Sequence, residues 1–117
     1  MKKMPKFVEV EEFKKDLRKF KIDIEEDFER FKKALAVDPQ NLNGAVKISN
    51  LGAGILPVYK ARKFRCKVLK KGSQSGIRVV YTYDQKTDEI ILIEIYFKSK
   101  KENHDLYRIR KYTIKSL

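Results

Sequence analysis

The sequence has little of what most enzymes use for catalysis. Its 117 residues include one cysteine and one histidine. A single cysteine excludes an intramolecular disulfide, and we expect a reducing compartment, the cytoplasm. The longest apolar run, Ile90 to Ile93, is too short to span a membrane, and the basic start of the chain lacks the apolar stretch of a secretory signal. We therefore predict a cytoplasmic protein with no membrane partner.

Motifs for nucleophilic, metal or nucleotide chemistry are also missing. Cys66 falls on the apolar side of a predicted strand, where a buried, inert thiol is expected. The only acidic cluster, Glu25 to Glu29, is explained by a solvated helix start. Gly52 and Gly54 are not followed by the Lys-Ser/Thr pair of a phosphate-binding loop. The sequence therefore predicts neither a metal site nor a cofactor.

What the chain does have is positive charge, and it lies in the second half. The net charge is +12, and residues 60–117 contain 16 Lys or Arg against 6 Asp or Glu. Residues 1–59 contain 12 basic and 10 acidic residues, so they are nearly neutral. Such an excess indicates a polyanionic partner, which is a nucleic acid, an acidic protein or a membrane surface.

The length fits one domain, residues 1–117, which begins with two helices. Apolar residues recur at helical spacing from Val10 to Phe20 and again from Ile24 to Leu35. Asp23 and Glu26 resemble a capping box at the start of the second helix, and Asp38-Pro39 ends it. We predict a helical hairpin, followed by a turn-rich stretch over residues 40–57.

Strands are predicted next. Alternation indicates strands over residues 64–69 and 77–83, joined by a flexible loop over residues 70–76. Residues 89–97 are almost continuously apolar, which is typical of a strand buried on both faces. Short connections favour an antiparallel meander, and residues 7–10 could add an edge strand. Asn103 could cap a C-terminal helix, although residues 106–114 also tolerate a strand.

Cleavage of RNA is a reaction that needs neither metal nor protein nucleophile, because the ribose 2′-hydroxyl attacks the adjacent phosphate. A protein must position it, transfer protons and stabilise charge on the phosphate. Arg65 and Lys67 share a predicted strand face, Arg78 begins the next strand, and Lys101 and Tyr107 follow the apolar strand. Arginine binds two phosphate oxygens at once, and tyrosine stacks on bases. Composition alone does not separate this pattern from a passive basic surface.

Three segments resemble the RelE/ParE toxin superfamily, in its HigB/RelE-like branch. They are YKARKFRCK (59–67), SGIRVVY (75–81) and IILIEIYFKSKKEN (90–103), in this order and spacing. The resemblance covers residues 59 to about 112. It implies an α+β fold, in which an N-terminal helical hairpin packs on a three- to four-stranded antiparallel sheet with a short C-terminal helix.

The resemblance also implies a function and a set of roles. RelE-type toxins cleave mRNA in the ribosomal A site without metal and are silenced by an antitoxin protein, whose contact segment we expect to be acidic. By position, Arg65 and Lys67 are similar to strand cations that act near the 2′-hydroxyl, although arginine is a poor base. Arg78 is similar to the arginine at the scissile phosphate, Lys101 to a second arginine, and Tyr107 to a C-terminal tyrosine. His104 could supplement Tyr107, but a surface histidine without a role also explains it.

Further cations are expected to bind the nucleic acid backbone rather than to act in catalysis. They are Lys60, Arg62, Lys63, Lys70, Lys71, Lys98, Lys100, Arg108, Arg110 and Lys111.

Two other functions remain open at this point. A ParE-like toxin would poison DNA gyrase by protein contact and would not need a cationic strand face with a tyrosine. A non-catalytic nucleic-acid-binding module would need only the charge of the second half. The sequence favours a ribosome-dependent mRNA endoribonuclease over both.

Overall fold

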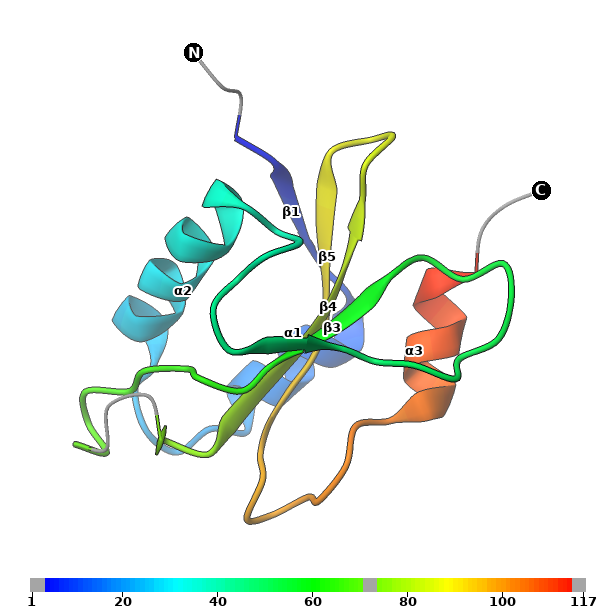
Figure 1. The fold of residues 1–117 in the computed structure, drawn as a ribbon. Coiled ribbons are helices and arrows are strands. Elements are labelled where there is room, and N and C mark those ends of the chain that lie inside the picture. Colours follow the sequence, from blue (N-terminus) through cyan, green and yellow to red (C-terminus); the bar gives the residue numbers. More distant parts are fainter. Residues whose placement is uncertain (1–3, 71–73, 115–117) are drawn as a thin grey trace.

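The structure, a computed structural model, describes residues 4–70 and 74–114. Within these residues five strands form one sheet, and three helices cover its faces (Figure 1). The elements are β1 (Lys6–Glu9), α1 (Glu11–Arg18), α2 (Glu25–Val37), β2 (Ala45–Lys47), β3 (Val58–Ala61), β4 (Ile77–Asp84), β5 (Glu89–Phe97) and α3 (Leu106–Thr113). No helix in the described part of the chain is long and apolar enough to cross a lipid bilayer.

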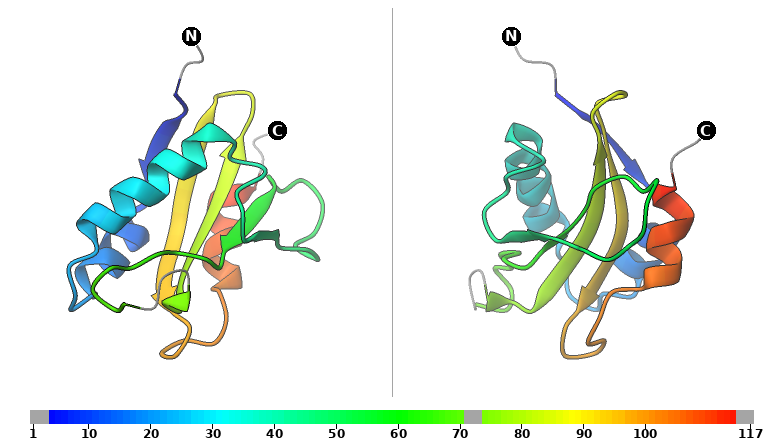
Figure 2. Two further views of the ribbon diagram at one scale, coloured as in Figure 1. Left: turned by 60° about the vertical axis from the view of Figure 1, so that its left-hand side comes forward. Right: turned by 45° about the vertical axis from the view of Figure 1, so that its right-hand side comes forward.

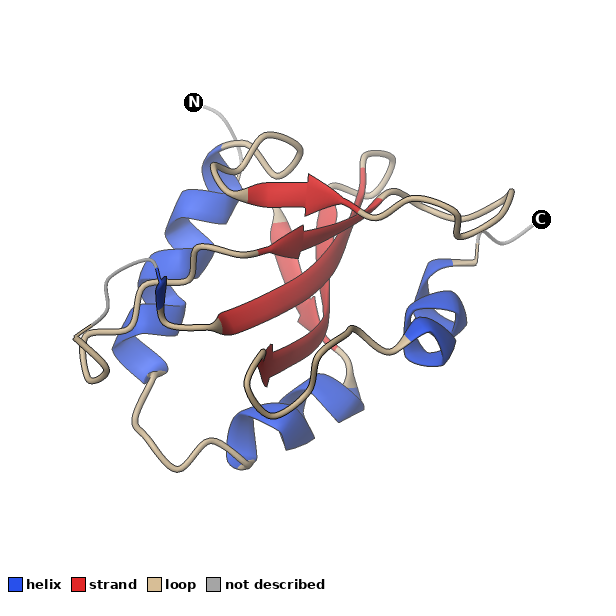
Figure 3. Cartoon of the chain, turned by 60° about the horizontal axis from the view of Figure 1, so that its bottom comes forward, coloured by secondary structure: helices blue, strands red, loops and turns tan. Residues whose placement is uncertain are grey.

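The strand order across the sheet is β1-β5-β4-β3-β2 (Figure 3). Strands β2 to β5 form an antiparallel meander, and β1 pairs parallel to β5. The pairing of β1 ends at Leu92, so the second half of β5 has no strand on its outer side.

A β-bulge changes the direction of side chains in the middle of β5. Val80 lies opposite Glu94, whereas the next residue of β4, Tyr81, lies opposite Leu92. Ile93 is therefore the extra residue on β5. Bulges of this kind redirect neighbouring side chains, and here Ile93 joins the same apolar cluster as Val80.

The two faces of the sheet are covered unequally. Figure 2 shows α2 on one side of the sheet and α3 on the other, and α1 packs against β5 at the edge of the sheet, with Phe13 in the same core as Phe28 of α2. The first side, which we call the α1/α2 face, buries the larger core; it includes Phe13, Phe28, Leu35, Ala61, Ile77, Val79, Tyr81, Leu92 and Ile95. The second side, the α3 face, buries a smaller cluster of Leu51, Val58, Val80, Ile93, Tyr96 and Ile109.

Most elements predicted from the sequence are confirmed. The two N-terminal helices are α1 and α2, the strands predicted at residues 77–83 and 89–97 are β4 and β5, and the C-terminal segment is the helix α3. The α+β fold class is confirmed. The sheet has five strands and is mixed, rather than three- to four-stranded and antiparallel, because residues 6–9 and 45–47 add short edge strands.

The strand predicted at residues 64–69 is wrong, because β3 lies upstream at Val58–Ala61. The alternation of apolar residues that suggested a strand correctly predicts burial at Phe64 and Cys66. However, the backbone N–H of Lys67 donates to the carboxylate of Asp27 on α2, at 3.3 and 3.4 Å, rather than to a strand. Residues 62–66 form no regular element and residues 67–70 form a turn, and the segment is attached to α2 through Asp27. Lys71, within the predicted loop, lies outside the described residues.

Both predicted helix caps are also wrong. Ile24 is the N-cap of α2, and the Asp23 carboxylate instead accepts from the N–H of Glu25 at 3.1 Å. For α3 the N-cap is Asp105, whose carboxylate accepts from the N–H of Arg108 at 3.1 Å, and not Asn103. Polar residues precede both helices, and the local sequence pattern does not show which position before the helix is the N-cap.

The helices α1 and α3 contact each other past the outer edge of β5, through Glu12. Its carboxylate accepts a hydrogen bond from the Tyr112 hydroxyl and one from Lys111 Nζ at 3.3 Å. The bond from Tyr112, together with the Lys111 ammonium, lowers the pKa of Glu12 from 4.5 to about 2.

We expect this contact to weaken in acid. A carboxyl group with a lowered pKa contributes stability above its unfolded pKa, and the contribution is lost as the pH falls through the folded pKa. The stabilising contribution should therefore begin to fall below about pH 4.5, and the chemical shifts of α3 should change most near about pH 2, the pKa in the folded protein. In Tyr112→Phe the change should occur at higher pH. Identical acid titrations of the two proteins would contradict this assignment.

Candidate functional site

The α3 face carries the charged side chains that β3, β4 and β5 bring together. Ala61 and Val79 face the opposite core, so Lys60 and Arg78 project on the α3 face by strand alternation. Lys60 lies opposite Val80, which in turn lies opposite Glu94. Cross-strand register therefore sets a lysine, an arginine and a glutamate within one small area.

Beside these strands lies an open hollow of about 700 Å³ with a cationic lining. We call it the basic groove and define it by its four charged residues, Arg62, Lys63, Arg78 and Lys98. Its other lining residues are uncharged; they are Gly44, Ala45, Val46, Gln74 and Gly76. Four like charges around one hollow repel one another, and an anion such as a phosphate would relieve that repulsion.

Backbone contacts hold the two ends of this groove. Arg78 Nη1 donates to the carbonyl oxygen of Arg62 at 3.2 Å. The N–H of Lys98 donates to the carbonyl oxygen of Gly76 at 2.8 Å. The guanidinium of Arg78 is thus positioned by β3, and the start of the Lys98 segment is fixed to the start of β4.

Lys60 lies at the inner side of this cationic set. Burial lowers its pKa first, and the positive charges of Arg62 and Arg78 lower it further. Its Nζ is 3.2 Å from Nδ1 of His104, a residue 44 positions away in the sequence. Lys60 is therefore an ammonium group that loses its proton more readily than an ordinary lysine.

Glu94 organises the segment that brings His104 to the sheet. It is 1% exposed, which is rare for a carboxylate, and it forms an ion pair with Lys101. Its other oxygen, Oε1, accepts from the N–H of Asp105 at 2.9 Å. Because one buried carboxylate binds both Lys101 and Asp105, the chain between them, with His104, is held against β5.

The surroundings of His104 favour the neutral form of its imidazole. Partial burial lowers its pKa first, and the nearby charges of Lys60 and Lys101 add to the effect, whereas Glu94 opposes them. A neutral imidazole has one nitrogen that accepts and one that donates a proton.

Tyr96 lies opposite Arg78, on the same face. It is buried, and its hydroxyl has no hydrogen-bond partner among the described residues. Burial and the charge of Glu94 raise its pKa. The ring lies 5.7 Å from Lys101 Nζ, so it forms part of the wall beneath that side chain.

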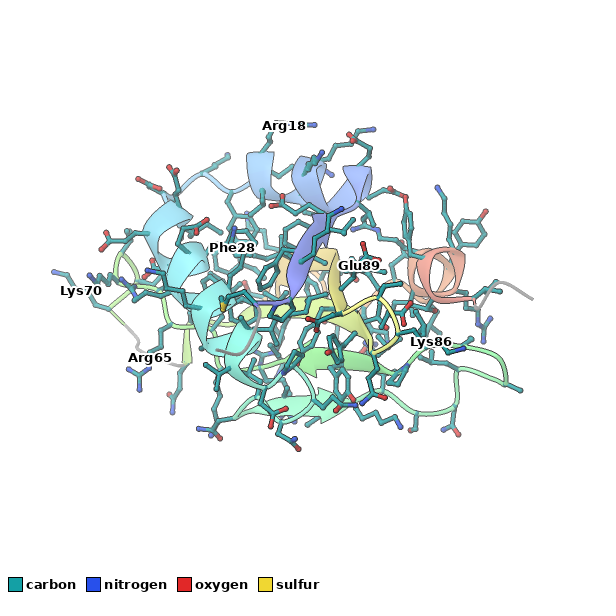
Figure 4. The ribbon with its side chains drawn as sticks, turned by 90° about the horizontal axis from the view of Figure 1, so that it is seen from above. Arg18, Phe28, Arg65, Lys70, Lys86 and Glu89 are labelled. Carbon is teal, nitrogen blue, oxygen red and sulfur yellow. The ribbon has the colours of Figure 1, made fainter. Side chains whose placement is uncertain are left out.

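The structure does not bring Arg65 and Lys67 to Arg78. Lys67 Nζ is 3.3 Å from Glu26 on α2, and Arg65 lines a separate hollow with Asp27 and other residues of α2. Both therefore lie on the α1/α2 side. Figure 4 shows the labelled Arg65 and Lys70 projecting outward next to α2. The missing strand at residues 64–69 explains the difference, because the predicted shared face depended on it.

The other predicted residues are distributed as follows. Lys101 lies at the site, in its ion pair with Glu94, and Tyr107 is 81% exposed on the first turn of α3. Arg108 is half-buried and paired with Asp16, and Lys111 contacts Glu12. Exposed side chains that line no part of the basic groove are Lys70, Lys100 and Arg110.

Glu94 and Tyr96 were not singled out in the sequence, and His104 was considered only as a supplement to Tyr107 or as a surface residue without a role. Glu94 had a signal, since it is the single charge within the apolar stretch of residues 90–97. Lys60 and Arg62 were predicted only as backbone-binding cations, although their spacing of two is the same as that of Arg65 and Lys67.

Comparison with known proteins identifies the fold. Neither a protein-family model nor a curated protein sequence matches this chain. Among solved structures, RelE from the RelE–RelB complex of Pyrococcus horikoshii matches with a TM-score of 0.60 and 18% identity, over 84% of this chain and 99% of that chain. A free Escherichia coli RelE mutant matches with a TM-score of 0.59 and 16% identity, over 92% and 94%. The RelBE2 toxin–antitoxin complex of Mycobacterium tuberculosis gives 0.58 and 16%, over 81% and 99%.

The chain therefore has the fold of RelE toxins, as the resemblance predicted. The HigB branch stays a prediction.

Proposed function

We propose that this protein, which has the RelE fold, is the toxin of a toxin–antitoxin pair and cleaves mRNA in the ribosomal A site without a metal ion. The observation that carries the proposal is the convergence of Lys60, Arg62, Arg78 and Lys98 on one side of the sheet, next to a neutral histidine. A surface that only binds nucleic acid would not require a partly buried lysine such as Lys60, or a buried carboxylate with two partners such as that of Glu94.

The basic groove suits the phosphate at which the chain is cut. Arg62 and Arg78 can each bind two phosphate oxygens, and Lys98 adds a further positive charge. Charge on the phosphate oxygens increases as the 2′-oxygen attacks, so fixed cations stabilise the transition state more than the substrate. The hollow is open, which agrees with a substrate presented by a larger assembly rather than enclosed by the protein.

The roles assigned to the strand cations change with the structure. We assign the two positions near the 2′-hydroxyl to Lys60 and Arg62, rather than to Arg65 and Lys67, because Lys60 on β3 and Arg62 just after it lie next to Arg78. Lys101 acts as a positioning residue through Glu94. Tyr107, exposed at the start of α3, is proposed to stack on a base next to the cut.

The proposed partners follow from the same charges. Complexes of RelE with RelB in P. horikoshii support an antitoxin for this chain as well. We expect its contact segment to be acidic and to cover the basic groove, and we expect both proteins in the cytoplasm. A segment of net positive charge at that contact would contradict the proposal.

Induced expression tests the proposed function. We expect growth to stop, translation to fall, and mRNA to carry new ends within codons occupied by ribosomes, whereas purified protein should cut free mRNA far more slowly. A DNA-damage response with intact mRNA would show a gyrase poison instead. Harmless expression with salt-sensitive RNA binding would show a non-catalytic module.

A further inference from the structure

Lys60 and His104 form a contact that two charged groups would not make. Lys60 Nζ and His104 Nδ1 are 3.2 Å apart, which is hydrogen-bond distance. If both groups carried a proton at these atoms, the contact would be repulsive. It is a hydrogen bond only when at least one of the two groups has lost a proton, so the pair holds at most one positive charge.

The ordinary acidities of the two groups decide where that charge lies. A lysine ammonium is a far weaker acid than an imidazolium, by roughly four pH units. Near neutral pH Lys60 therefore keeps its proton, and Nδ1 of the neutral imidazole accepts the hydrogen bond. The imidazole then carries its own proton on Nε2.

The surroundings keep the pair in this state. His104 faces Lys60 of β3, Glu94 of β5 and Lys101 of its own segment. The neighbouring carboxylate of Asp105 is turned to the helix start, where it accepts from the N–H of Arg108. Glu94 binds both flanking residues, Lys101 and Asp105, so the imidazole is held in position before any substrate binds.

We propose that Lys60 and His104 are the proton donor of the RNA cleavage, with His104 passing a proton from Lys60 to the leaving 5′-oxygen. The assignment rests on the proposed function. The pair lies beside the cations of the basic groove, since Arg62, Arg78 and Lys98 are the charges that act on Lys60. It therefore lies next to the position that a scissile phosphate would take.

The step balances as follows. The 2′-oxygen forms a bond to phosphorus and releases its proton to water, while the bond from phosphorus to the 5′-oxygen breaks. His104 gives the Nε2 proton to the 5′-oxygen, and Nδ1 takes a proton from Lys60. The products are a 2′,3′-cyclic phosphate, a 5′-hydroxyl end, a neutral imidazole protonated on Nδ1 and a neutral lysine. Nδ1 then returns its proton to Lys60, and Nε2 takes a proton from water, which restores the starting state.

The first test needs no RNA. His104 is the only histidine, so its imidazole signals in nuclear magnetic resonance are unambiguous. We expect the Nε2–H tautomer at neutral pH, and a histidine pKa that rises in Lys60→Met because a nearby positive charge is removed. Lys86→Met, on the turn between β4 and β5, is the control and should leave the pKa unchanged. A Nδ1–H tautomer, or equal pKa values in wild type and Lys60→Met, would overturn the pair.

The second test measures cleavage on ribosomes programmed with a defined mRNA. We expect His104→Gln to cut roughly 10²- to 10⁴-fold more slowly, the usual loss for one proton-transfer group. An mRNA with sulfur in place of the leaving 5′-oxygen should restore most of the rate, because a thiolate leaves without a proton. That rescue also shows that the variant is folded.

The outcomes separate the two proposals. If wild-type protein cleaves and His104→Gln cleaves equally well, or if sulfur does not rescue the variant, the proton-donor role is wrong while the proposed function stands. If wild-type protein does not cut mRNA on the ribosome, the proposed function fails and the role falls with it.

Discussion

Replacing Arg78 with alanine should slow mRNA cleavage on programmed ribosomes by about 10²- to 10³-fold, the loss typical of removing one donor that stabilises transition-state charge. Arg78 lines the basic groove, and its guanidinium is positioned by the carbonyl of Arg62. Single-turnover cleavage of one defined mRNA measures the effect.

Two further variants make this prediction specific. Arg78→Lys keeps the charge but loses the planar fork, so we expect an intermediate rate. Lys86→Ala removes a cation at the turn after β4, away from the groove, and should cleave like wild type. If Lys86→Ala and Arg78→Ala lose activity equally, the effect is one of net charge, and the groove has no special role.

The second large effect concerns stability: Asp16→Ala should lower the free energy of unfolding by about 3 kcal/mol. Asp16 Oδ2 is 2.6 Å from Arg108 Nη1, and the two side chains are only 12% and 15% exposed. The same carboxylate accepts from the N–H of Ile95 at 3.2 Å, and Arg108 donates to the carbonyl of Ile93 at 3.1 Å.

The Asp16–Arg108 pair makes backbone hydrogen bonds to β5 that a neighbouring strand would otherwise make. The pairing of β1 ends at Leu92, and the two side chains bind the backbone of β5 just beyond that point. Removing Asp16 leaves the Arg108 cation and the Ile95 N–H without their partner in a largely buried place, which costs more than the lost bond itself.

Urea unfolding followed by circular dichroism measures this change. Glu11→Ala is the matched control on the same helix, because its contact with Lys14 is exposed and worth at most about 1 kcal/mol. The double variant Asp16→Leu/Arg108→Met should lose less unfolding free energy than the two single variants lose in sum, because no unpaired charge remains in it. Equal losses for Asp16→Ala and Glu11→Ala would show that the edge of β5 does not depend on this pair.

The strand prediction shows where local pattern is sufficient and where it is not. In β4 the alternation of side chains and the backbone pairing agree, and the prediction is confirmed. At Phe64 and Cys66 the alternation correctly predicts which side chains are buried, but the backbone is attached to α2 through Asp27. Side-chain pattern reports burial. It does not report which group accepts a backbone N–H.

The candidate site shows the same division. The sequence grouped Arg78 with Arg65 and Lys67 and gave Lys60 and Arg62 only as backbone-binding cations, whereas the register of β3 and β4 puts Lys60 and Arg78 on one face. The contact of Lys60 with His104 spans 44 positions and depends on Glu94, which binds the intervening segment. No local periodicity links these residues.

The amino-acid sequence alone determined the helical pair, the apolar strand β5, the concentration of positive charge in the second half and the resemblance to RelE, because each depends on neighbouring residues or on composition. The tertiary structure alone decided that Lys60 rather than Lys67 accompanies Arg78, and that His104 meets Lys60. The reason is physical. A buried carboxylate and the register of three strands set those distances, and both exist only when residues far apart in the chain have come together.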